Sequence, residues 1–179
     1  ALLLLGPQTP MLFQGQEFAA SAPFLYFADH GGDLARLVDE GRRGELSQFA
    51  NLALDEMQAV VAAPHDPETW ARCRLDHAER ERHRAWWELH RDLLALRRDD
   101  ACFGEPGVRV DGAVLSDDAL VLRFLAPDGD HARDRLLCVN LGRAVHLDPA
   151  PEPLLAPPVG TRWDVLWSSE DPRYGGIGA

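Results

Sequence analysis

Lysine is missing from this sequence. All 18 basic residues among its 179 are arginine, and Ile177 is its only isoleucine. Leucine, alanine, proline and glycine are abundant instead, as is typical of proteins from a GC-rich genome. The alternative is that the arginines were selected to stack on rings or to bind carboxylates through two hydrogen bonds. We favour the coding bias, so the arginines carry no weight in the functional prediction.

Other scarce features exclude whole classes of protein. Acidic residues outnumber basic ones by 29 to 18, and the net charge of −11 argues against nucleic acid or an anionic membrane as a partner. No apolar run approaches the roughly 18 residues of a membrane-spanning helix. Three cysteines cannot form an all-disulfide framework, which favours the reducing cytoplasm. The hydrophobic fraction of 46% is too high for a disordered chain.

Common catalytic and metal-binding motifs are absent as well. The histidines show no zinc signature, and Cys73, Cys102 and Cys138 lack C-x-x-C spacing. Ser21 is not part of a G-x-S-x-G nucleophile elbow. A phosphate-binding loop is excluded because its lysine is missing. The sequence therefore predicts no metal site, no cofactor and no Ser-His-Asp triad.

The chain begins with an apolar run that looks like the end of a helix. Leucines 2–5 have no N-cap before them, and Gly6 and Pro7 follow as stop signals. Residues 9–15 then predict a short buried strand, and this order predicts an α/β unit with a parallel sheet. Since residues 174–179 form a glycine-rich end, we expect a fragment cut at the front or at both ends.

Helical patterns dominate the middle of the chain. We expect a helix over residues 33–51 and another helix start at Asp66-Pro67. The clearest helix runs from Ala78 to Arg98, preceded by Asp76 and Glu79 at the spacing of a capping box. Its apolar stripe toward the core consists of Trp86, Leu89, Leu93 and Leu96.

After Gly104 the pattern changes to short β-branched or alternating runs separated by turns. These runs predict an antiparallel β-sandwich or meander, with the boundary to the helical part near residues 99–107. Trp163 and Trp167 lie on one face of the last run, which favours packing in the sandwich core over a sugar-stacking platform. The expected strands are 108–110, 113–115, 119–125, 135–141, 145–147 and 163–167.

Glu17 opens the long loop of residues 16–32, and loops of that length in a compact domain are usually functional. An acidic residue just after a strand has the position of an active-site group in a (β/α)8 barrel. A retaining glycoside hydrolase needs two such carboxylates about 5 Å apart. The alternative, which we favour for Glu17, is that it orients the loop backbone or pairs with an arginine.

The same loop displays three aromatic residues, Phe24, Tyr26 and Phe27. Aromatic rings stack on the faces of sugars, so these side chains either line a saccharide site or pack beneath the loop as ordinary core. Asp29 and His30 follow at the end of the loop. They either form hydrogen bonds with sugar hydroxyls or cap the next helix.

The motifs together resemble the α-amylase superfamily, glycoside hydrolase family 13. Residues 2–18 resemble the end of a leucine-rich helix followed by the last barrel strand, with the pattern T-P-[ML]-L-[FY]-x-G-x-E. Gln16 and Ala28 depart from the pattern, in positions where Glu and Thr or Ser are common. Further segments narrow the resemblance to the malto-oligosyltrehalose trehalohydrolase family. They are residues 20–30, Leu34–Arg43, Pro64–Trp70, Leu93–Arg98, Val139–Leu141 and Trp167–Gly176.

This resemblance implies a retaining hydrolase that cleaves the α-1,4-glucosidic bond next to the terminal trehalose unit of maltooligosyl trehalose and releases trehalose. Its three catalytic carboxylates are expected on barrel strands four, five and seven. The N-H-D motif that carries the third is absent here. We therefore expect all three to precede Ala1, so that this chain holds no catalytic residue and is inactive alone. Glu17 matches the glutamate of strand eight, at the barrel rim.

The resemblance also implies fold, domains and site. Residues 1–103 are expected to be the C-terminal part of a (β/α)8 TIM barrel, and residues 104–179 an antiparallel β-sandwich that is itself truncated. The implied partner is a neutral maltooligosaccharide in the cytoplasm, with the oligomeric state left open. The candidate substrate-binding residues are Gln16, Glu17, Phe24, Tyr26, Phe27, Asp29 and His30.

Two alternatives remain beside this interpretation. The chain could belong to another family 13 enzyme, such as a glycogen-branching enzyme or an α-amylase. It could also be a non-catalytic carbohydrate-binding or interaction module. Analysis of the reaction products distinguishes between the enzymes. A titration of the isolated chain with maltooligosaccharides distinguishes an enzyme fragment from a binding module.

Overall fold

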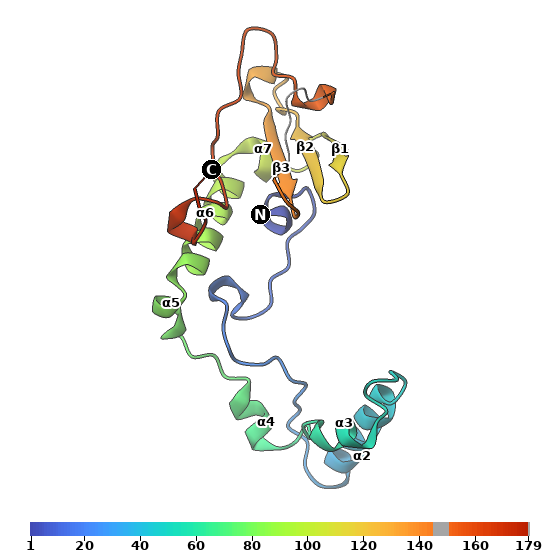
Figure 1. Ribbon diagram of the computed structural model, residues 1–179. Coiled ribbons are helices and arrows are strands. Elements are labelled where there is room, and N and C mark those ends of the chain that lie inside the picture. The colour runs from blue at the N-terminus through green and yellow to red at the C-terminus, as the bar shows by residue number, and fades with distance from the viewer. Residues whose placement is uncertain (145–150, 179) are drawn as a thin grey trace. The chain divides into compact units, whose positions relative to one another are not determined.

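The computed structural model describes residues 1–144 and 151–178, which form two compact units (Figure 1). The core unit comprises Ala1–Phe18 together with His83–Ala179, and the loop unit comprises Ala19–Arg82. The strand predicted at residues 145–147 lies outside the described residues. Each unit is considered by itself below.

A three-stranded antiparallel sheet in the order β1-β2-β3 forms one layer of the core unit. Its strands are β1 (Val110–Ser116), β2 (Ala119–Phe124) and β3 (Arg135–Asn140). Val114 pairs with Leu120, which in turn pairs with Val139, and β1 has an irregularity just after Val114. These three strands confirm the prediction of an antiparallel meander. Val121 and Phe124 are both buried although they point to opposite faces of β2, so each face of this central strand is partly covered.

The last predicted strand, residues 163–167, is wrong. This segment is irregular in the structure, and its two tryptophans are held by side-chain hydrogen bonds rather than by a strand ladder. The indole of Trp163 donates to the Leu155 carbonyl (2.8 Å), close to the 3-10 turn η3 (Pro153–Leu155). The indole of Trp167 donates to the Tyr174 hydroxyl (3.2 Å) in the turn η4 (Pro172–Tyr174).

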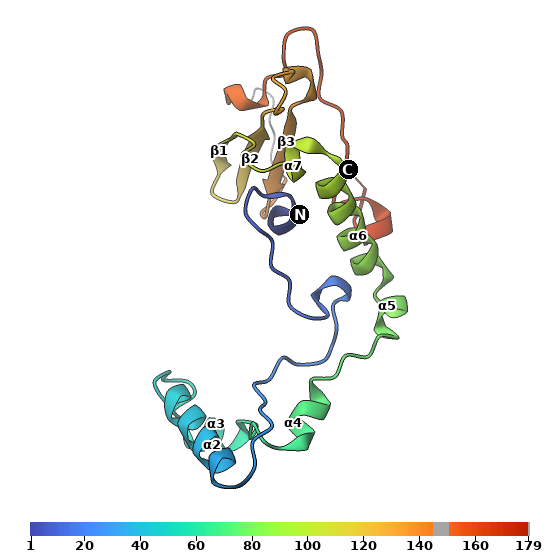
Figure 2. The same ribbon diagram turned by 180° about the vertical axis from the view of Figure 1, so that it is seen from behind.

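The helices α1 (Leu2–Leu5), α6 (Arg84–Asp99) and α7 (Ala101–Gly104) complete the core unit, and the short 3-10 turn η2 (His131–Arg133) precedes β3. Figure 2 shows α1 and α7 beside the sheet, with α6 leading into α7. Apolar side chains from these elements form one core, in which the Phe103 ring packs edge-on against Phe124 at 4.9 Å. The core consists of Leu4, Leu5, Leu93, Cys102, Phe103, Phe124, Ala126 and Leu137.

The predicted helix from Ala78 to Arg98 is interrupted. It forms α5 (Glu79–Arg82) and α6, and His83 between them leaves the helical region at φ −108° and ψ 36°. The capping box is also only partly right, because Asp76 accepts from the Ala78 N–H while Glu79 binds Ser21 instead. Within the predicted stripe Leu93 is fully buried, but Trp86 is 54% exposed.

The buried strand predicted for residues 9–15 is not formed. Met11 is 73% exposed and Phe13 is 58% exposed, and the segment reaches the 3-10 turn η1 (Gln16–Phe18) without a strand partner among the described residues. A parallel strand needs a neighbour for its backbone N–H and C=O groups, so an apolar sequence alone does not form one. The parallel sheet expected from this segment is likewise not formed by the residues that the structure describes.

The loop unit carries α2 (Gly32–Leu46), α3 (Asp55–Val60), α4 (Pro67–Arg72) and α5. The helix start at Asp66 is confirmed. Its carboxylate accepts the Glu68 N–H, and Pro67 occupies the first helical position. The α2 helix ends at Leu46, five residues earlier than predicted. Among the described residues, no helix in either unit has the length and apolar character needed to cross a membrane.

Candidate functional site

Gln16 and Glu17 lie in the turn η1 of the core unit. The Gln16 side-chain carbonyl accepts the Phe13 N–H (3.2 Å), and the Gln16 N–H donates to the Phe13 carbonyl (3.1 Å). Glu17 is half-buried, while the next residue, Phe18, is fully buried. The turn therefore fixes the backbone on both sides of Glu17.

The aromatic residues of the predicted site lie in the loop unit, on an extended segment before α2. Phe24 is 66% exposed, Tyr26 51% and Phe27 42%, so the interpretation as buried loop packing does not hold within this unit. The segment is held by its backbone: the Leu25 N–H donates to the Cys73 sulfur (3.3 Å) and the Ala28 N–H to the Pro64 carbonyl (2.9 Å). Polar anchoring of the backbone leaves the rings at the surface.

The three rings are not equivalent. The Arg42 guanidinium lies over the Tyr26 ring, 5.4 Å from its centroid, and also pairs with Glu45 at 2.8 Å. A cation over one face of an aromatic ring is favourable and covers that face. Phe24 is the most exposed of the three side chains.

Asp29 and His30 are exposed, and neither caps the helix that follows. The N-cap of α2 is Gly31, and no side chain accepts a hydrogen bond at that helix start. The His30 N–H instead donates to the Ala28 carbonyl (3.1 Å), which turns the backbone at this point. Both side chains are thus available for polar contacts with a ligand.

The structure therefore divides the predicted site residues into two groups. Gln16 and Glu17 share the turn η1 in the core unit. The other five share one extended segment, residues 24–30, in the loop unit. The described residues contain no cluster of three or more histidine, cysteine, aspartate or glutamate side chains that could hold a metal ion.

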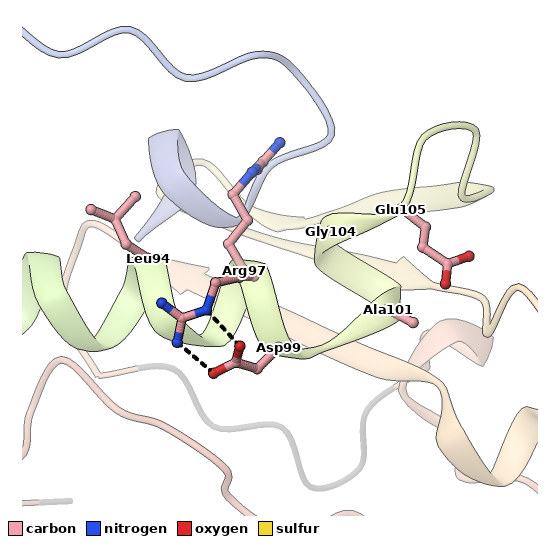
Figure 3. Close-up of a pocket in the computed structure, with 7 residues that line it drawn as sticks. Leu94, Arg97, Asp99, Ala101, Gly104 and Glu105 are labelled. Atoms are coloured by element: carbon pink, nitrogen blue, oxygen red, sulfur yellow. Dashed lines mark hydrogen bonds and ion pairs between the residues drawn. The ribbon is translucent and has the colours of Figure 1, made fainter.

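An open hollow between α6 and α7 contains none of the predicted site residues (Figure 3). It is lined by Leu94, Arg97, Arg98 and Ala101, among others. Arg98 and Asp99 form a two-bond ion pair at 2.7 and 2.8 Å, in which both side chains are exposed. The two charges of the pair are thus matched within the hollow.

Sequence reasoning missed a polar cluster in which the C-terminal segment binds α6. The Tyr174 hydroxyl donates to Asp92 Oδ2 (2.7 Å), and the Arg173 guanidinium lies 3.2 Å from the same oxygen. The hydrogen bond from Tyr174 lowers the pKa of Asp92, and Arg91 and Arg173 add to that effect. Burial, together with the carboxylate of Asp92, raises the pKa of Tyr174.

The turn around η4 also explains why residue 176 is a glycine. A side chain there would place its Cβ 2.2 Å from the Glu170 carbonyl, so only glycine fits. Asp171 caps the turn by accepting the Arg173 N–H (3.0 Å). The motif of residues 167–176 thus has a structural role. In the sequence, only its resemblance to a family pattern pointed to this motif.

Comparison with known proteins first defines a class. Residues 109–179 match a family model described as a domain of unknown function, DUF3459. The structure resembles that of a Salmonella typhimurium protein assigned as an alpha amylase, with a TM-score of 0.59 and 32% identity. That similarity covers 78% of this chain and 23% of the other. The chain is thus similar to part of an α-amylase-type protein.

Curated sequences that are similar to this chain share one name. The chain is 45% identical over 102 residues to malto-oligosyltrehalose trehalohydrolase of Deinococcus radiodurans, covering 56% of this chain and 16% of the relative. The same enzyme of Rhizobium sp. strain M-11 is 38% identical over 126 residues, or 69% of this chain and 20% of the relative. The resemblance predicted from the sequence is confirmed: the chain resembles part of the malto-oligosyltrehalose trehalohydrolases, and the matches span a fifth of their length or less.

Proposed function

We propose that this chain is the C-terminal part of a retaining glycoside hydrolase that releases trehalose from maltooligosyl trehalose by cleaving the adjacent α-1,4-glucosidic bond. The observation that carries the proposal is the 45% identity over 102 residues to a trehalohydrolase. The three carboxylates of the reaction would come from residues outside this sequence. The 179 residues alone are then inactive, and the enzyme acts in the cytoplasm.

The proposed architecture assigns residues 1–103 to the end of a (β/α)8 barrel and residues 104–179 to a β-sandwich domain. The three-stranded antiparallel sheet β1-β2-β3 supports the second assignment. For the first, the irregular segment 9–15 would become the last barrel strand once neighbouring strands pair with its backbone. Its exposed Met11 and Phe13 side chains are consistent with that role, since they would then be covered.

The proposed contacts with the saccharide come from the exposed residues of the loop unit and from the turn η1. Phe24 would stack on a glucose ring, because its side chain is the most exposed of the three aromatics. Asp29 and His30 would bind hydroxyls, since both are exposed and neither caps α2. Gln16 and Glu17 would act at the barrel rim, where Glu17 binds substrate or fixes the loop rather than forming the glycosyl bond.

Product analysis tests the reaction. The complete gene product that contains this chain is incubated separately with maltooligosyl trehalose, a linear maltooligosaccharide and glycogen, and the products are separated by chromatography. We expect trehalose from the first substrate and little change in the others. Shortened maltooligosaccharides without trehalose would favour an α-amylase, and new α-1,6 branches a branching enzyme. Either result would overturn the proposal.

A titration tests whether the chain alone is a binding module. The 179-residue chain is titrated with maltooligosaccharides while its tryptophan fluorescence is followed, and the variant Phe24→Ala is compared with Phe49→Ala, which removes another exposed ring of the loop unit. We expect weak or no binding by the chain. Tight, saturable binding that Phe24→Ala abolishes and Phe49→Ala does not would favour a carbohydrate-binding module.

A further inference from the structure

The helix α6 is attached to both ends of the segment that leads to the candidate site. Near its C-terminal end, the Arg97 guanidinium donates to the carbonyl oxygens of Leu4 (2.8 Å), Gly6 (2.8 Å) and Gln8 (3.2 Å). These carbonyls lie at the end of α1 and just after it, where the helix leaves acceptors without partners. Arg97 thus helps to set the direction in which the chain leaves α1, together with the Gln8 side-chain amide, which donates to the Leu2 and Leu3 carbonyls.

The second attachment lies at the other end of the same helix. His83 directly precedes α6, and its ring nitrogen Nδ1 lies 2.9 Å from the carbonyl oxygen of Phe18. Phe18 is the last residue of η1. A carbonyl only accepts, so the ring must donate through Nδ1–H. The backbone of His83 is non-helical, so that α6 begins after this residue.

The segment between the two attachments is also anchored by Leu12, which is half-buried and packs against the core. His83 and Arg97 are 14 residues apart, or about 21 Å along a helix at 1.5 Å per residue. The intervening chain, residues 9–15, forms no regular element, and Met11 and Phe13 are exposed. The position of the segment is therefore set by its two ends, by the packing of Leu12 and by the short turn at Gln16.

We propose that His83 and Arg97 are positioning residues, which hold the turn with Gln16 and Glu17 in place for saccharide binding by fastening both ends of residues 8–18 to the rigid helix α6. The functional part of this inference rests on the proposed saccharide site. The geometric part does not, since it concerns only hydrogen bonds within the core unit. The two residue types suit their tasks: arginine presents a planar fork of donors to three acceptors, which a lysine ammonium cannot do in the same geometry.

Hydrogen exchange on the 179-residue chain tests the attachment at His83. The amides of Gln16 and Phe18 report on the turn, because they donate to the carbonyls of Phe13 and Gly15. For His83→Ala we expect these two amides to exchange about three- to tenfold faster, the loss that one net hydrogen bond predicts. The amide of Val121 in β2 should keep its rate. His83→Asn should restore slow exchange, because the asparagine amide N–H replaces Nδ1–H.

His90→Asn is the matched control, since the His90 ring also bonds a carbonyl, that of Trp86, but within α6 itself. It should leave the Gln16 and Phe18 amides unchanged relative to Val121. Unchanged exchange at Gln16 and Phe18 in His83→Ala would overturn the proposal. Equal acceleration at Val121 would overturn it too, because His83 would then only contribute to global stability.

The attachment at Arg97 is tested by comparing Arg97→Lys with Arg98→Lys. Both variants keep the charge, but Arg98 is exposed and pairs with its neighbour Asp99. We expect several-fold faster exchange of the Gln16 amide in Arg97→Lys, and no change in Arg98→Lys. The inference is wrong for Arg97 if the two variants behave alike.

Kinetics of the complete gene product then test the role in binding. We expect His83→Ala to raise the KM for maltooligosyl trehalose about three- to tenfold with kcat little changed, and His83→Asn to restore KM. A fall in kcat alone would contradict positioning for binding. If the protein releases no trehalose at all, the proposed function fails, while the exchange experiment still decides whether the turn is held by α6.

Discussion

The core unit and the loop unit are stabilised by different interactions. The core unit buries a continuous set of apolar side chains around Leu93 and Phe124, which are 0% and 1% exposed. In the loop unit the buried apolar residues are Ala35, Pro64 and Cys73, whereas larger ones such as Val60 remain exposed. Burial of apolar area is the dominant favourable term in folding, so the loop unit has the weaker basis for stability.

Polar contacts replace a core in the loop unit. Arg43 joins α2 to α3 by donating to the carbonyls of Gln58 and Val61, and it also pairs with Asp39 (3.1 Å). The buried Glu79 carboxylate accepts both the N–H and the hydroxyl of Ser21, at 2.9 and 2.6 Å. A unit held in this way should open locally before the core unit unfolds. The comparison teaches that the predicted sugar-binding aromatics are displayed by a polar framework.

The largest effect is expected in the core unit. Phe124→Ala removes a ring that is 1% exposed and packs on Phe103, so it should lower the free energy of unfolding by about 3–5 kcal/mol. Val114→Ala, in the neighbouring strand but 79% exposed, serves as the control and should change stability far less. Urea unfolding followed by circular dichroism measures both. If both variants lost the same free energy of unfolding, the side chain of Phe124 would not contribute to a hydrophobic core.

A smaller and local effect is expected in the loop unit. Glu79→Ala leaves the Ser21 N–H and hydroxyl without their acceptor, which costs about 1–3 kcal/mol. We expect faster hydrogen exchange at Ser21 and earlier proteolysis near it, with the exchange of Val121 unchanged. Glu81→Ala, an exposed neighbour, is the control. A global loss of stability in Glu79→Ala would contradict the independence of the two units.

The cluster at Asp92 predicts a pH dependence confined to the core unit. The pKa of Asp92 lies below its ordinary value of 3.8 because of the bond from Tyr174, so its stabilisation is present above pH 3.8 and is lost as the pH falls through the lowered pKa. When the pH falls from 6 to 2.5, we expect the free energy of unfolding to decrease less in Asp92→Asn than in the parent chain. The two decreases should differ by about 1 kcal/mol. Denaturant unfolding at the two pH values measures this difference. Equal losses would mean that the bond does not stabilise the ionised carboxylate.

The smallest effect concerns the first residue of the loop unit. Ala19 has φ +50°, a left-handed conformation that is unfavourable for residues with a Cβ. Ala19→Gly should therefore raise the free energy of unfolding by up to about 1 kcal/mol, despite the greater freedom of glycine in the unfolded chain. Ala20→Gly, at an ordinary φ, should be neutral or destabilising. Calorimetry of the two variants measures the difference.

Much of the local structure could be predicted because its causes lie close in sequence. Asp66-Pro67 carries its own helix start, and the apolar run within residues 119–124 indicates a strand. The structure of the apolar segment 9–15 could not be predicted from local sequence. Its composition predicts a strand, but a strand also requires a partner that the local sequence does not specify. His83 similarly interrupts a strong helical pattern, and its ring bonds the carbonyl of Phe18, 65 residues away.

The candidate site shows the same division. Its members could be named from the aromatic composition of residues 16–32 and from resemblance, and their role in binding remains a prediction. The sequence did not indicate that Arg42 covers Tyr26, that Asp29 leaves the α2 start uncapped, or that Arg97 holds three carbonyls. Each of these facts depends on side chains that meet only after folding.

By itself, the sequence determined the acidic, lysine-free character of the chain, its caps and turns, three of its strands and its resemblance to the trehalohydrolases. These properties follow from residue type and short-range spacing. Tertiary structure alone decided which apolar residues form the core, where the long helix breaks and how α6 holds the turn that carries Glu17. Those outcomes depend on burial and on hydrogen bonds between distant residues, whose energies exist only once the chain has brought the groups together.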